Sequence, residues 1–338
     1  MSDAAAKPVP AVRTHYVRFG LIAGGIAAVL LVLNAFTSGH LLEPGNVINV
    51  LRQITYNAIM AIGQTFVIIA AGIDLSVGSL VSLTGVVMAL FVNAVHFEGP
   101  LLVAATLLVG VAIGGLAGFV NAIPVVKLNM PPFITTLAMM LMARGLAYNL
   151  SHGTPIAIET NAFSLTGTGY IFDGLRASTG FPGIPVAVIW MAVIALGFGT
   201  LLARTRFGRY VYALGGNEEA ARLAGINVAQ VKTLAYVISG ACAGVAGLLL
   251  MARFSSGSPQ TGLGYELQAI AAVVVGGTSL VGGRGTIAGT FAGALLIGAL
   301  YNAMNLLHIE SYTQEIVLGA VILGAVTIDE VRKRYLSK

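Results

Sequence analysis

The stretch "MAIGQTFVIIAAGIDLSVGSLVSLTGVVMAL", residues 60–90, contains one charged residue, Asp74, between two apolar runs. With the residues on either side, each run approaches the ~20 residues that a helix needs to cross ~30 Å of hydrocarbon. Backbone groups in lipid have to be hydrogen-bonded within the protein, so both runs are expected to be helices. The stretch therefore predicts two membrane helices joined by a short connection around Gly72 and Asp74.

The whole chain has the composition of a membrane protein. Hydrophobic residues make up 57% of its 338 residues and charged residues 9%, against about 25% charged residues in soluble domains, and the mean hydropathy is +0.89. The chain is therefore expected to be an all-α polytopic membrane protein. Ten spans are predicted, at roughly 18–36, 54–72, 75–95, 100–122, 132–150, 184–203, 233–253, 266–281, 286–307 and 313–329.

The distribution of Lys and Arg predicts that both termini are cytoplasmic, because basic residues favour that side of the membrane. With this orientation, 14 of the 18 basic residues lie in cytoplasmic segments. These charges are spread over separate short loops, so a nucleic-acid-binding surface is not expected. The domain organisation that follows is a single transmembrane domain, 1–338, with a cytoplasmic N-terminal tail at 1–17, a periplasmic loop at 151–183, a cytoplasmic loop at 204–232 and a cytoplasmic C-terminal tail at 330–338.

The two long loops are the candidates for contact with partner proteins. The periplasmic loop is rich in Gly, Ser and Thr, which suits either a structured docking loop or a plain connector. In the cytoplasmic loop, Asn217 is expected to cap a helix that begins with Glu218 and Glu219 and ends before Gly225. A helix of about two turns is unstable alone in water. It is therefore expected to pack on its own chain or in the groove of a partner.

Polar residues within the predicted spans indicate a path for an uncharged solute. Gln53, Asn57 and Gln64 are four and seven residues apart, so they fall on one stripe of a helix. The other candidates for this path are Thr135, Thr136, Asn302 and Asn305. Amides and hydroxyls suit a neutral polyol, but the same residue types also form hydrogen bonds between membrane helices.

Asp74 is expected to be the N-cap of a helix that starts at Leu75, accepting the backbone N–H of Ser76 or Val77. The stretch "GTSLVGG", residues 277–283, aligns with "GIDLSVG", residues 72–78, and places Ser279 at the position of Asp74. A shared cap role would explain this Asp–Ser interchange. The alternatives for Asp74 are a gate or substrate contact and proton coupling.

Four stretches carry a resemblance to a known family. They are "AGIDLSVGS" (71–79), "NMPPFITTLAMMLMARGLAY" (129–148), "GRYVYALGGNEEAARLAGINV" (208–228) and "ARFSSGSPQTGLGYELQAIAAVVVGGTSLVGGRGT" (252–286). From about residue 47 to its end, the chain resembles the permease subunits of bacterial ABC importers of the ribose/xylose/galactoside type.

The resemblance implies a permease homodimer, or a dimer with a close paralogue, embedded in inner-membrane lipid. It also implies ATPase subunits on the cytoplasmic face and a periplasmic sugar-binding protein that delivers a neutral monosaccharide or related polyol, first of all a ribose-like pentose. The residues expected to contact the ATPase are Arg209, Glu218, Glu219, Ala220, Arg222 and Gly225, of which Glu218, Glu219, Ala220 and Gly225 match the coupling motif of the family.

The sequence predicts no catalytic, cofactor or metal site. It contains no G-x-x-x-x-G-K-[ST] phosphate-binding loop and no H-E-x-x-H or G-x-S-x-G motif, so ATP hydrolysis is expected on a separate subunit. The alternative function is an ion-coupled secondary transporter of a small polar solute. Such a transporter calls for several ionisable groups in the membrane, and the candidates here are Asp74 and Arg144.

Overall fold

A computed structural model describes residues 11–172 and 183–336. Parts of three predicted segments lie outside the described residues, namely 1–10 of the N-terminal tail, 173–182 of the periplasmic loop and 337–338 of the C-terminal tail. The described helices of the first half are α1 (Ala11–Phe36), the short 3₁₀ helix η1 (His40–Leu42), α2 (Pro44–Ile69), α3 (Val77–Ala94), α4 (Pro100–Lys127), α5 (Pro132–Leu150) and α6 (Ser164–Thr168).

The second half continues with α8 (Val186–Arg204), α9 (Arg206–Gly216), α10 (Glu218–Leu223), α11 (Val228–Phe254), α12 (Tyr265–Val275), α13 (Ile287–Leu306) and α14 (Ser311–Leu336). Four two-residue strands form two small antiparallel ladders. They are β1 (Ile156–Ala157) with β4 (Ser256–Gly257), and β2 (Tyr170–Ile171) with β3 (Ile184–Pro185).

Six helices of the described chain are long and apolar enough to cross a membrane: α3, α4, α5, α8, α11 and α13. This confirms the prediction of an all-α polytopic membrane protein. The predicted span at 266–281 is wrong as one continuous helix, because α12 ends at Val275 and Gly277 has a positive φ of 87°. At 1.5 Å per residue, its 11 residues are about 16 Å long, which is too short to span a bilayer.

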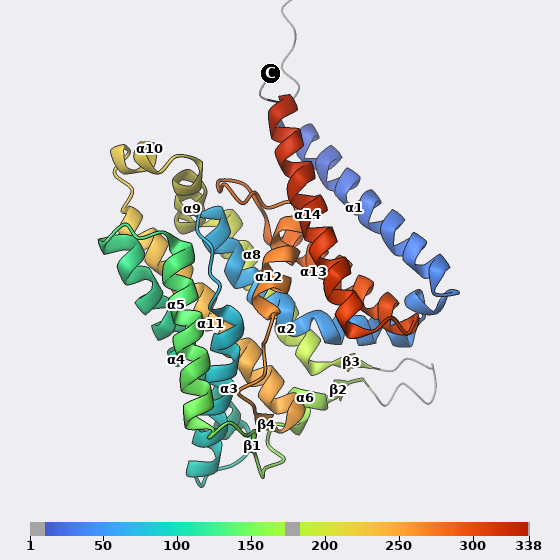
Figure 1. The fold of residues 1–338 in the computed structure, drawn as a ribbon, viewed down its shortest axis with the longest axis vertical. Helices are drawn as coiled ribbons and strands as arrows, with labels where there is room; N and C mark the ends of the chain where they lie inside the picture. The colour runs from blue at the N-terminus through green and yellow to red at the C-terminus, as the bar shows by residue number, and fades with distance from the viewer. Residues whose placement is uncertain (1–10, 173–182, 337–338) are drawn as a thin grey trace, which may run out of the picture.

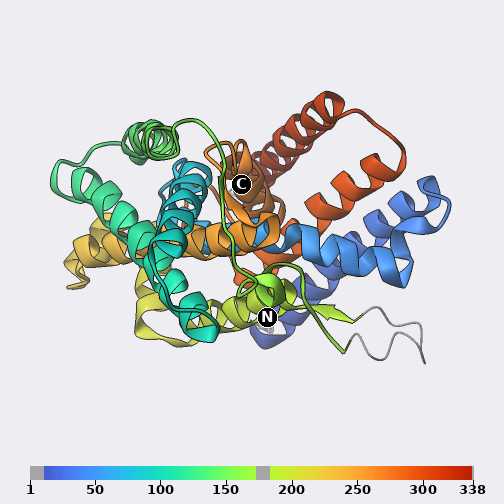
Figure 2. The ribbon, with the colours of Figure 1, turned by 90° about the horizontal axis from the view of Figure 1, so that it is seen from below.

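The helices form one bundle in which α2, α3 and α11 are central. Most residues of α2 from Ile54 onward are fully buried, and so is the middle of α11 from Ser239 to Ala252 apart from Ala241 and Val245. In both views of the ribbon, α4 and α5 lie on one side of the bundle, and η1 with the loop between α13 and α14 lies on the other (Figures 1 and 2). The outer faces of α4, α5 and α8 expose large apolar side chains such as Leu108, Leu141 and Leu196, as lipid-facing surfaces do.

Glycines let α4 and α11 approach each other closely, as their small-xxx-small spacing predicts. A Cβ on Gly114 would collide with the carbonyl oxygen of Gly240, and a Cβ on Gly244 with that of Gly110. The same holds between α12 and α13, where Gly293 lies against the carbonyl of Ala272. The glycine spacings therefore mark helix crossings of the bundle core.

Candidate functional site

The chain between α2 and α3 is non-helical although helices surround it. The end of α2 is closed by a Schellman motif, in which the N–H of Gly72 donates to Val67 O and the N–H of Ala71 to Ile68 O. Ala71 has a positive φ of 60° at the position that favours glycine. Non-helical backbone at membrane depth is tolerated only where protein or a water-filled cavity covers it. Residues 70–76, called the α2–α3 break below, are buried or half-buried apart from Ala71, which is exposed.

Asp74 is the centre of the α2–α3 break and its side chain is fully buried. One carboxylate oxygen accepts the backbone N–H of Ser76 at 2.9 Å and the Ser76 hydroxyl at 2.6 Å. The other accepts the hydroxyl of Ser239, on α11, at 2.9 Å. A carboxylate is an acceptor-only group when ionised, so three donors offset part of the cost of removing it from water.

Neighbouring helices also hold the backbone of the break. The amide of Gln64, on α2, donates to the carbonyl oxygen of Asp74 at 2.9 Å, and the hydroxyl of Thr136, on α5, donates to that of Ile73 at 3.2 Å. The amide of Asn121, on α4, donates to the Ser76 hydroxyl at 2.9 Å. Side chains from α2, α4, α5 and α11 therefore meet at one seven-residue segment.

Of the two caps predicted, by Asp74 and by Ser279, the structure confirms only a hydrogen bond of Asp74. The predicted bond from the Ser76 N–H to Asp74 is present, but α3 begins at Val77 rather than Leu75 and its N-cap position is Ser76. Asp74 thus forms a turn ahead of the helix. The predicted cap by Ser279 is wrong, because α13 begins only at Ile287 and its cap is Thr286, whose hydroxyl accepts the N–H of Gly289. An Asp74 carboxylate reaches two neighbours, whereas the equivalent segment before α13 is closed by backbone hydrogen bonds such as Gly282 N–H to Ser279 O.

The seven residues predicted for a solute path have different surroundings among the described residues. Gln53 and Asn57 line a cavity between α2, α12 and α13, whereas Gln64 and Thr136 hold the α2–α3 break. The Thr135 hydroxyl donates to Pro132 O within its own helix. The structure therefore brings together two of the seven at a cavity.

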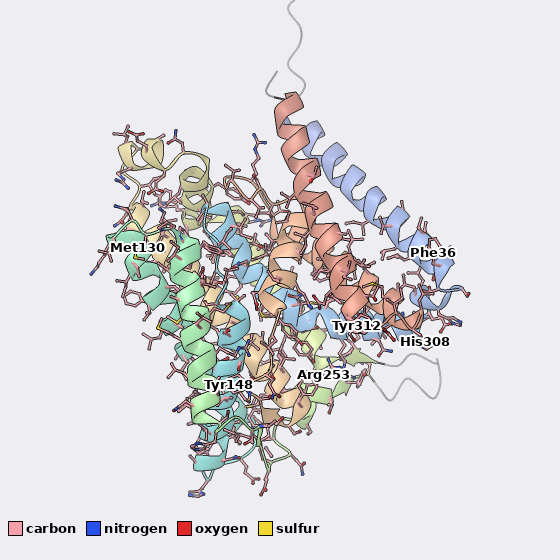
Figure 3. All side chains as sticks on the ribbon, in the orientation of Figure 1. Phe36, Met130, Tyr148, Arg253, His308 and Tyr312 are labelled. Carbon is pink, nitrogen blue, oxygen red and sulfur yellow. The ribbon has the colours of Figure 1, made fainter. Side chains whose placement is uncertain are left out.

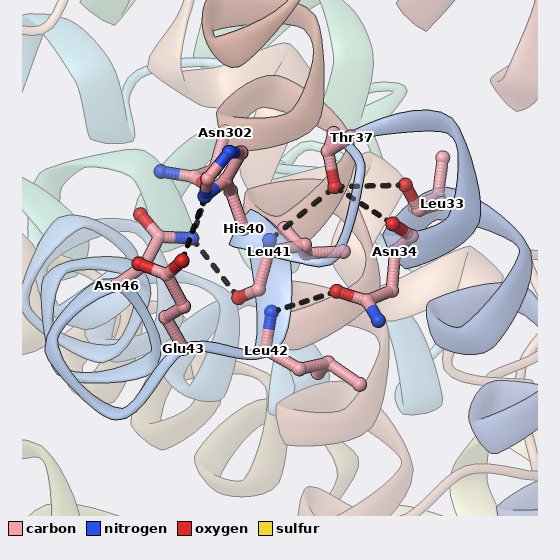
Figure 4. A network of polar contacts seen from close by, with 9 residues as sticks. All are labelled: Leu33, Asn34, Thr37, His40, Leu41, Leu42, Glu43, Asn46 and Asn302. Carbon is pink, nitrogen blue, oxygen red and sulfur yellow. Dashed lines mark hydrogen bonds and ion pairs between the residues drawn. The ribbon is translucent and has the colours of Figure 1, made fainter.

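The two asparagines of α13 stabilise local structure at the edge of the bundle. Asn302 accepts the amide of Asn46 at 2.7 Å, and Asn46 also binds the carbonyl of Leu41 in η1 (Figure 4). Asn305 accepts the amide of Gln314, on α14, at 2.8 Å. Both form hydrogen bonds between segments of the chain, which is the alternative that their residue type left open.

The short helix α10 is capped at both ends as the sequence predicts. The Asn217 side chain accepts the N–H of Ala220 at 2.9 Å. At the other end, Gly225 has a φ of 80°, its N–H donates to Arg222 O, and the N–H of Ile226 donates to Ala221 O, which completes a Schellman motif. Local hydrogen bonds thus fix both ends of a six-residue helix.

Helix α10 packs on the chain through one face and exposes the other. Ala221 is its buried residue, and Glu218 accepts Lys232 at 2.7 Å and Arg222 at 3.3 Å. Leu223 is 85% exposed to solvent. Apart from Glu218, the predicted ATPase contacts are exposed as well, namely Arg209, Glu219, Ala220, Arg222 and Gly225. Glu218 therefore holds the helix in place, and Leu223 is the most exposed large apolar side chain on the face of α10 that points away from the chain.

Helix α9 joins α10 to the ends of two membrane helices. The Tyr212 hydroxyl donates to Gly285 O at 2.7 Å, and burial raises the pKa of this phenol, which keeps it protonated as a donor. Gly215 lies so close to Ile69 O and Gly283 N that a Cβ would collide with both, and the Gly283 N–H itself donates to Ile69 O at 2.9 Å. Tyr212 and Gly215 thus contact the end of α2, beside the α2–α3 break, and the loop between α12 and α13.

The sequence analysis missed Ser239 and Tyr212, and it gave Arg144 no partner. Arg144, on α5, donates to Pro259 O at 2.7 Å and to Thr261 O at 2.9 Å. Each of these contacts joins residues far apart in the chain, as the 165 positions between Asp74 and Ser239 illustrate. A single sequence carries no local signal for such pairs.

The fold and the capped helix α10 define a multi-pass membrane protein with a structured projection between two membrane helices. The family model described as branched-chain amino acid transport system / permease component matches residues 46–326. The chain belongs to this family of permease components.

Several curated proteins are similar to most of the chain. The ribose import permease protein RbsC of Escherichia coli K12 is 44% identical over 301 residues, which cover 89% of this chain and 90% of the relative. RbsC of Bacillus subtilis 168 is 43% identical over 304 residues, with 89% of each covered. The xylose transport system permease protein XylH of Escherichia coli K12 is 36% identical over 360 residues, with 91% of each covered. No solved structure matched the chain.

The hydrogen bonds of Asp74 predict how its substitutions behave. Asp74→Asn can keep both bonds from Ser76 through its oxygen, while its amide donates to the Ser239 hydroxyl, so we expect a folded protein with most of its transport. Asp74→Leu leaves three buried donors unsatisfied, at about 1–3 kcal/mol each, so we expect a large loss of monodisperse protein in detergent. The measurement is extracted yield and substrate uptake for both variants. A well-folded but inactive Asp74→Asn protein would contradict a structural role and favour proton coupling.

Proposed function

We propose that this chain is the membrane subunit of an ATP-binding cassette importer in the bacterial inner membrane. It would move a neutral monosaccharide or related polyol, first of all a ribose-like pentose, from periplasm to cytoplasm. The observation that carries this proposal is helix α10, whose fixed position and exposed Leu223 suit insertion into a partner groove. Relatives named as ribose import and xylose transport permeases support the substrate class.

ATP would be bound and hydrolysed by a separate subunit that docks on α10. The 338-residue sequence has no G-x-x-x-x-G-K-[ST] motif with which to bind the nucleotide itself. The exposed residues Arg209, Glu219, Ala220, Arg222 and Leu223 would contact this ATPase. Glu218 would act through its ion pair with Lys232, which holds α10 against α11.

Motion of α10 would reach the membrane through α9. Tyr212 and Gly215 contact Gly285 and Ile69, and Ile69 ends the helix that precedes the α2–α3 break. A displacement of α9 by the ATPase would therefore move the loop between α12 and α13 together with the end of α2. This contact gives ATP hydrolysis a short route to the helices around the solute path.

The proposed topology has about ten membrane-spanning or membrane-embedded helices and both termini in the cytoplasm, within one permease domain, 1–338. Helix α10 and the C-terminal end of α14 lie toward the same end of the molecule, and β1, β4 and α6 lie toward the opposite end (Figure 1). That opposite end, with the loop 151–183, would receive the periplasmic sugar-binding protein. Two copies of the chain, or one copy and a close paralogue, would form the membrane dimer.

Ion-coupled transport is less well supported, because the two ionisable residues expected to serve it, Asp74 and Arg144, have structural partners. Asp74 accepts three hydrogen bonds, and Arg144 donates to two backbone carbonyls. A relay would need a group that can exchange protons or ions with the solute path. Neither Asp74 nor Arg144 lines the cavity that Gln53 and Asn57 share.

Leu223 tests the docking of the ATPase. Leu223→Asp places a charge at the exposed tip of α10, so we expect at least about tenfold less co-purified ATPase, as for an interface anchor. The matched control is Leu165→Asp, on α6 at the opposite end of the molecule, where the leucine is 61% exposed. Equal co-purification for Leu223→Asp and Leu165→Asp would contradict the assignment of α10.

Tyr212 tests transmission from α9. Tyr212→Phe removes one hydrogen bond, worth about 1 kcal/mol, and we expect normal ATPase co-purification with less uptake per ATP hydrolysed. The control is Tyr210→Phe, since Tyr210 lies on the same helix, is 40% exposed and has no hydrogen-bond partner among the described residues. If both variants couple ATP hydrolysis to uptake like the parent protein, the Tyr212–Gly285 contact transmits nothing.

A further inference from the structure

Two adjoining cavities lie beside Gln53 and share part of their lining. The inner one, about 170 Å³, lies between α2, α12 and α13. The outer one, about 450 Å³, shares Gln53, Tyr56 and Tyr265 with the inner one and adds Arg52 and Arg253. We call the two together the funnel, with the arginines at its wide part and Asn57 at its narrow part.

The wide end of the funnel faces away from α10. Arg253 lies near the end of α11 that leads into β4, toward the end of the molecule where α6 lies (Figure 3). Arg52 donates to the hydroxyl of Tyr170, in β2, at 2.9 Å. In the proposed topology this is the periplasmic side, so the wide part is the entrance.

The inner part is lined by uncharged polar groups and apolar walls. Amides come from Gln53, Asn57 and Gln268, and hydroxyls from Tyr56 and Tyr301, while side chains such as Ile297 complete it. None of its lining residues carries a charge. An ionised ligand would lose water there without gaining a countercharge, which is costly, whereas the hydroxyls of a polyol both donate to and accept from amides.

A chain of hydrogen bonds fixes the direction of these amides. Tyr301, on α13, donates its hydroxyl to a carboxylate oxygen of Glu315, on α14, at 3.3 Å, so it accepts the Gln268 amide at 3.4 Å. Gln268 in turn accepts the Asn57 amide at 3.2 Å. Because Glu315 only accepts, every donor in this series of hydrogen bonds points toward Glu315. The oxygen of Asn57, at the other end of the series, is left as a free acceptor.

That Asn57 oxygen is buried and has no hydrogen-bond partner among the described residues. A buried acceptor without a donor is costly, and a hydroxyl of a bound molecule would satisfy it once the amide turns toward the cavity. The inner volume corresponds to about five or six water molecules at ~30 Å³ each, which is the scale of one monosaccharide.

We propose that the inner cavity is a binding site within the permease for one neutral monosaccharide, and that Asn57 and Gln268 recognise its hydroxyl groups. This inference rests on the proposed function and places one sugar-binding site on the uptake route, between α2 and α12. Glu315 and Tyr301 position the two amides without touching the sugar.

Cysteine labelling can test the site, because Cys242 is the single cysteine of the chain and is buried. In a Cys242→Ala background assembled with ATPase and binding protein, Ile297→Cys and Gln53→Cys report on the inner and outer parts. Leu267→Cys is the control, since Leu267, on α12, does not line the cavity and is 51% exposed. The reagent is a water-soluble methanethiosulfonate.

We expect ribose to slow the labelling of Ile297→Cys and Gln53→Cys several-fold, with no effect on Leu267→Cys, and we expect leucine and ribonate to protect neither. Equal labelling of Ile297→Cys and Gln53→Cys with and without ribose, in a background that still takes up ribose, overturns the site and leaves the importer intact. Protection by leucine or ribonate as strong as that by ribose overturns the neutral-sugar assignment. A background with no ribose uptake, although it co-purifies the ATPase, overturns the proposed substrate and the site with it.

A second variant set measures the same inference through uptake. Asn57→Leu and Gln268→Leu remove the hydroxyl-recognising amides at similar volume, and we expect at least about tenfold lower ribose uptake with unchanged ATPase co-purification. The control is Gln260→Leu, at an exposed glutamine of the loop before α12. Ribose uptake by Asn57→Leu and Gln268→Leu equal to that of Gln260→Leu would overturn the assignment of the two amides.

Discussion

The packing of this membrane protein depends on the hydrogen bonds made by the α2–α3 break, whose residues are buried or half-buried apart from Ala71. The backbone there leaves the helix, so its polar groups need partners that lipid cannot provide. Gln64 and Thr136 donate to its carbonyl oxygens, and Asn121 donates to the Ser76 hydroxyl. The carboxylate of Asp74 accepts three bonds, one of them from Ser239 on α11. The helices that form the core are thereby tied to one buried point, which explains how a carboxylate can stand among apolar spans without a basic partner.

Helix α2 links the proposed ATPase-docking region to the proposed sugar site. Ile69, at the end of α2, contacts Gly215, on α9, and Gly283, in the loop between α12 and α13. The opposite half of the same helix carries Gln53 and Asn57 at the funnel. A shift of α9 thus acts on the helix that lines the cavity. Helix α12 forms the cavity wall opposite Asn57. It is short and is followed by a loop that contains glycines with positive φ. Because α9 contacts this loop, a shift of α9 would also act on α12.

The sequence predicted the features that local chemistry determines. Asn217 and Gly225 cap α10 as expected because the bonds lie within one turn, and the glycine spacings marked the α4–α11 crossing. It failed where partners are distant in the chain. Asp74 meets Ser239 across 165 positions, and hydropathy alone extended the eighth span into the loop after Val275. Among the path candidates, periodicity placed Gln53, Asn57 and Gln64 on one stripe, but only the neighbouring helices decide which of them faces a cavity.

Sugar uptake driven by ATP tests the account most directly. The protein would be reconstituted with its ATPase in proteoliposomes that hold ATP, with the binding protein outside and ionophores present to dissipate proton and sodium gradients. The account predicts ribose accumulation that needs ATP and the binding protein and is unaffected by the ionophores. Accumulation that persists without ATP and disappears when the ionophores are added would contradict it.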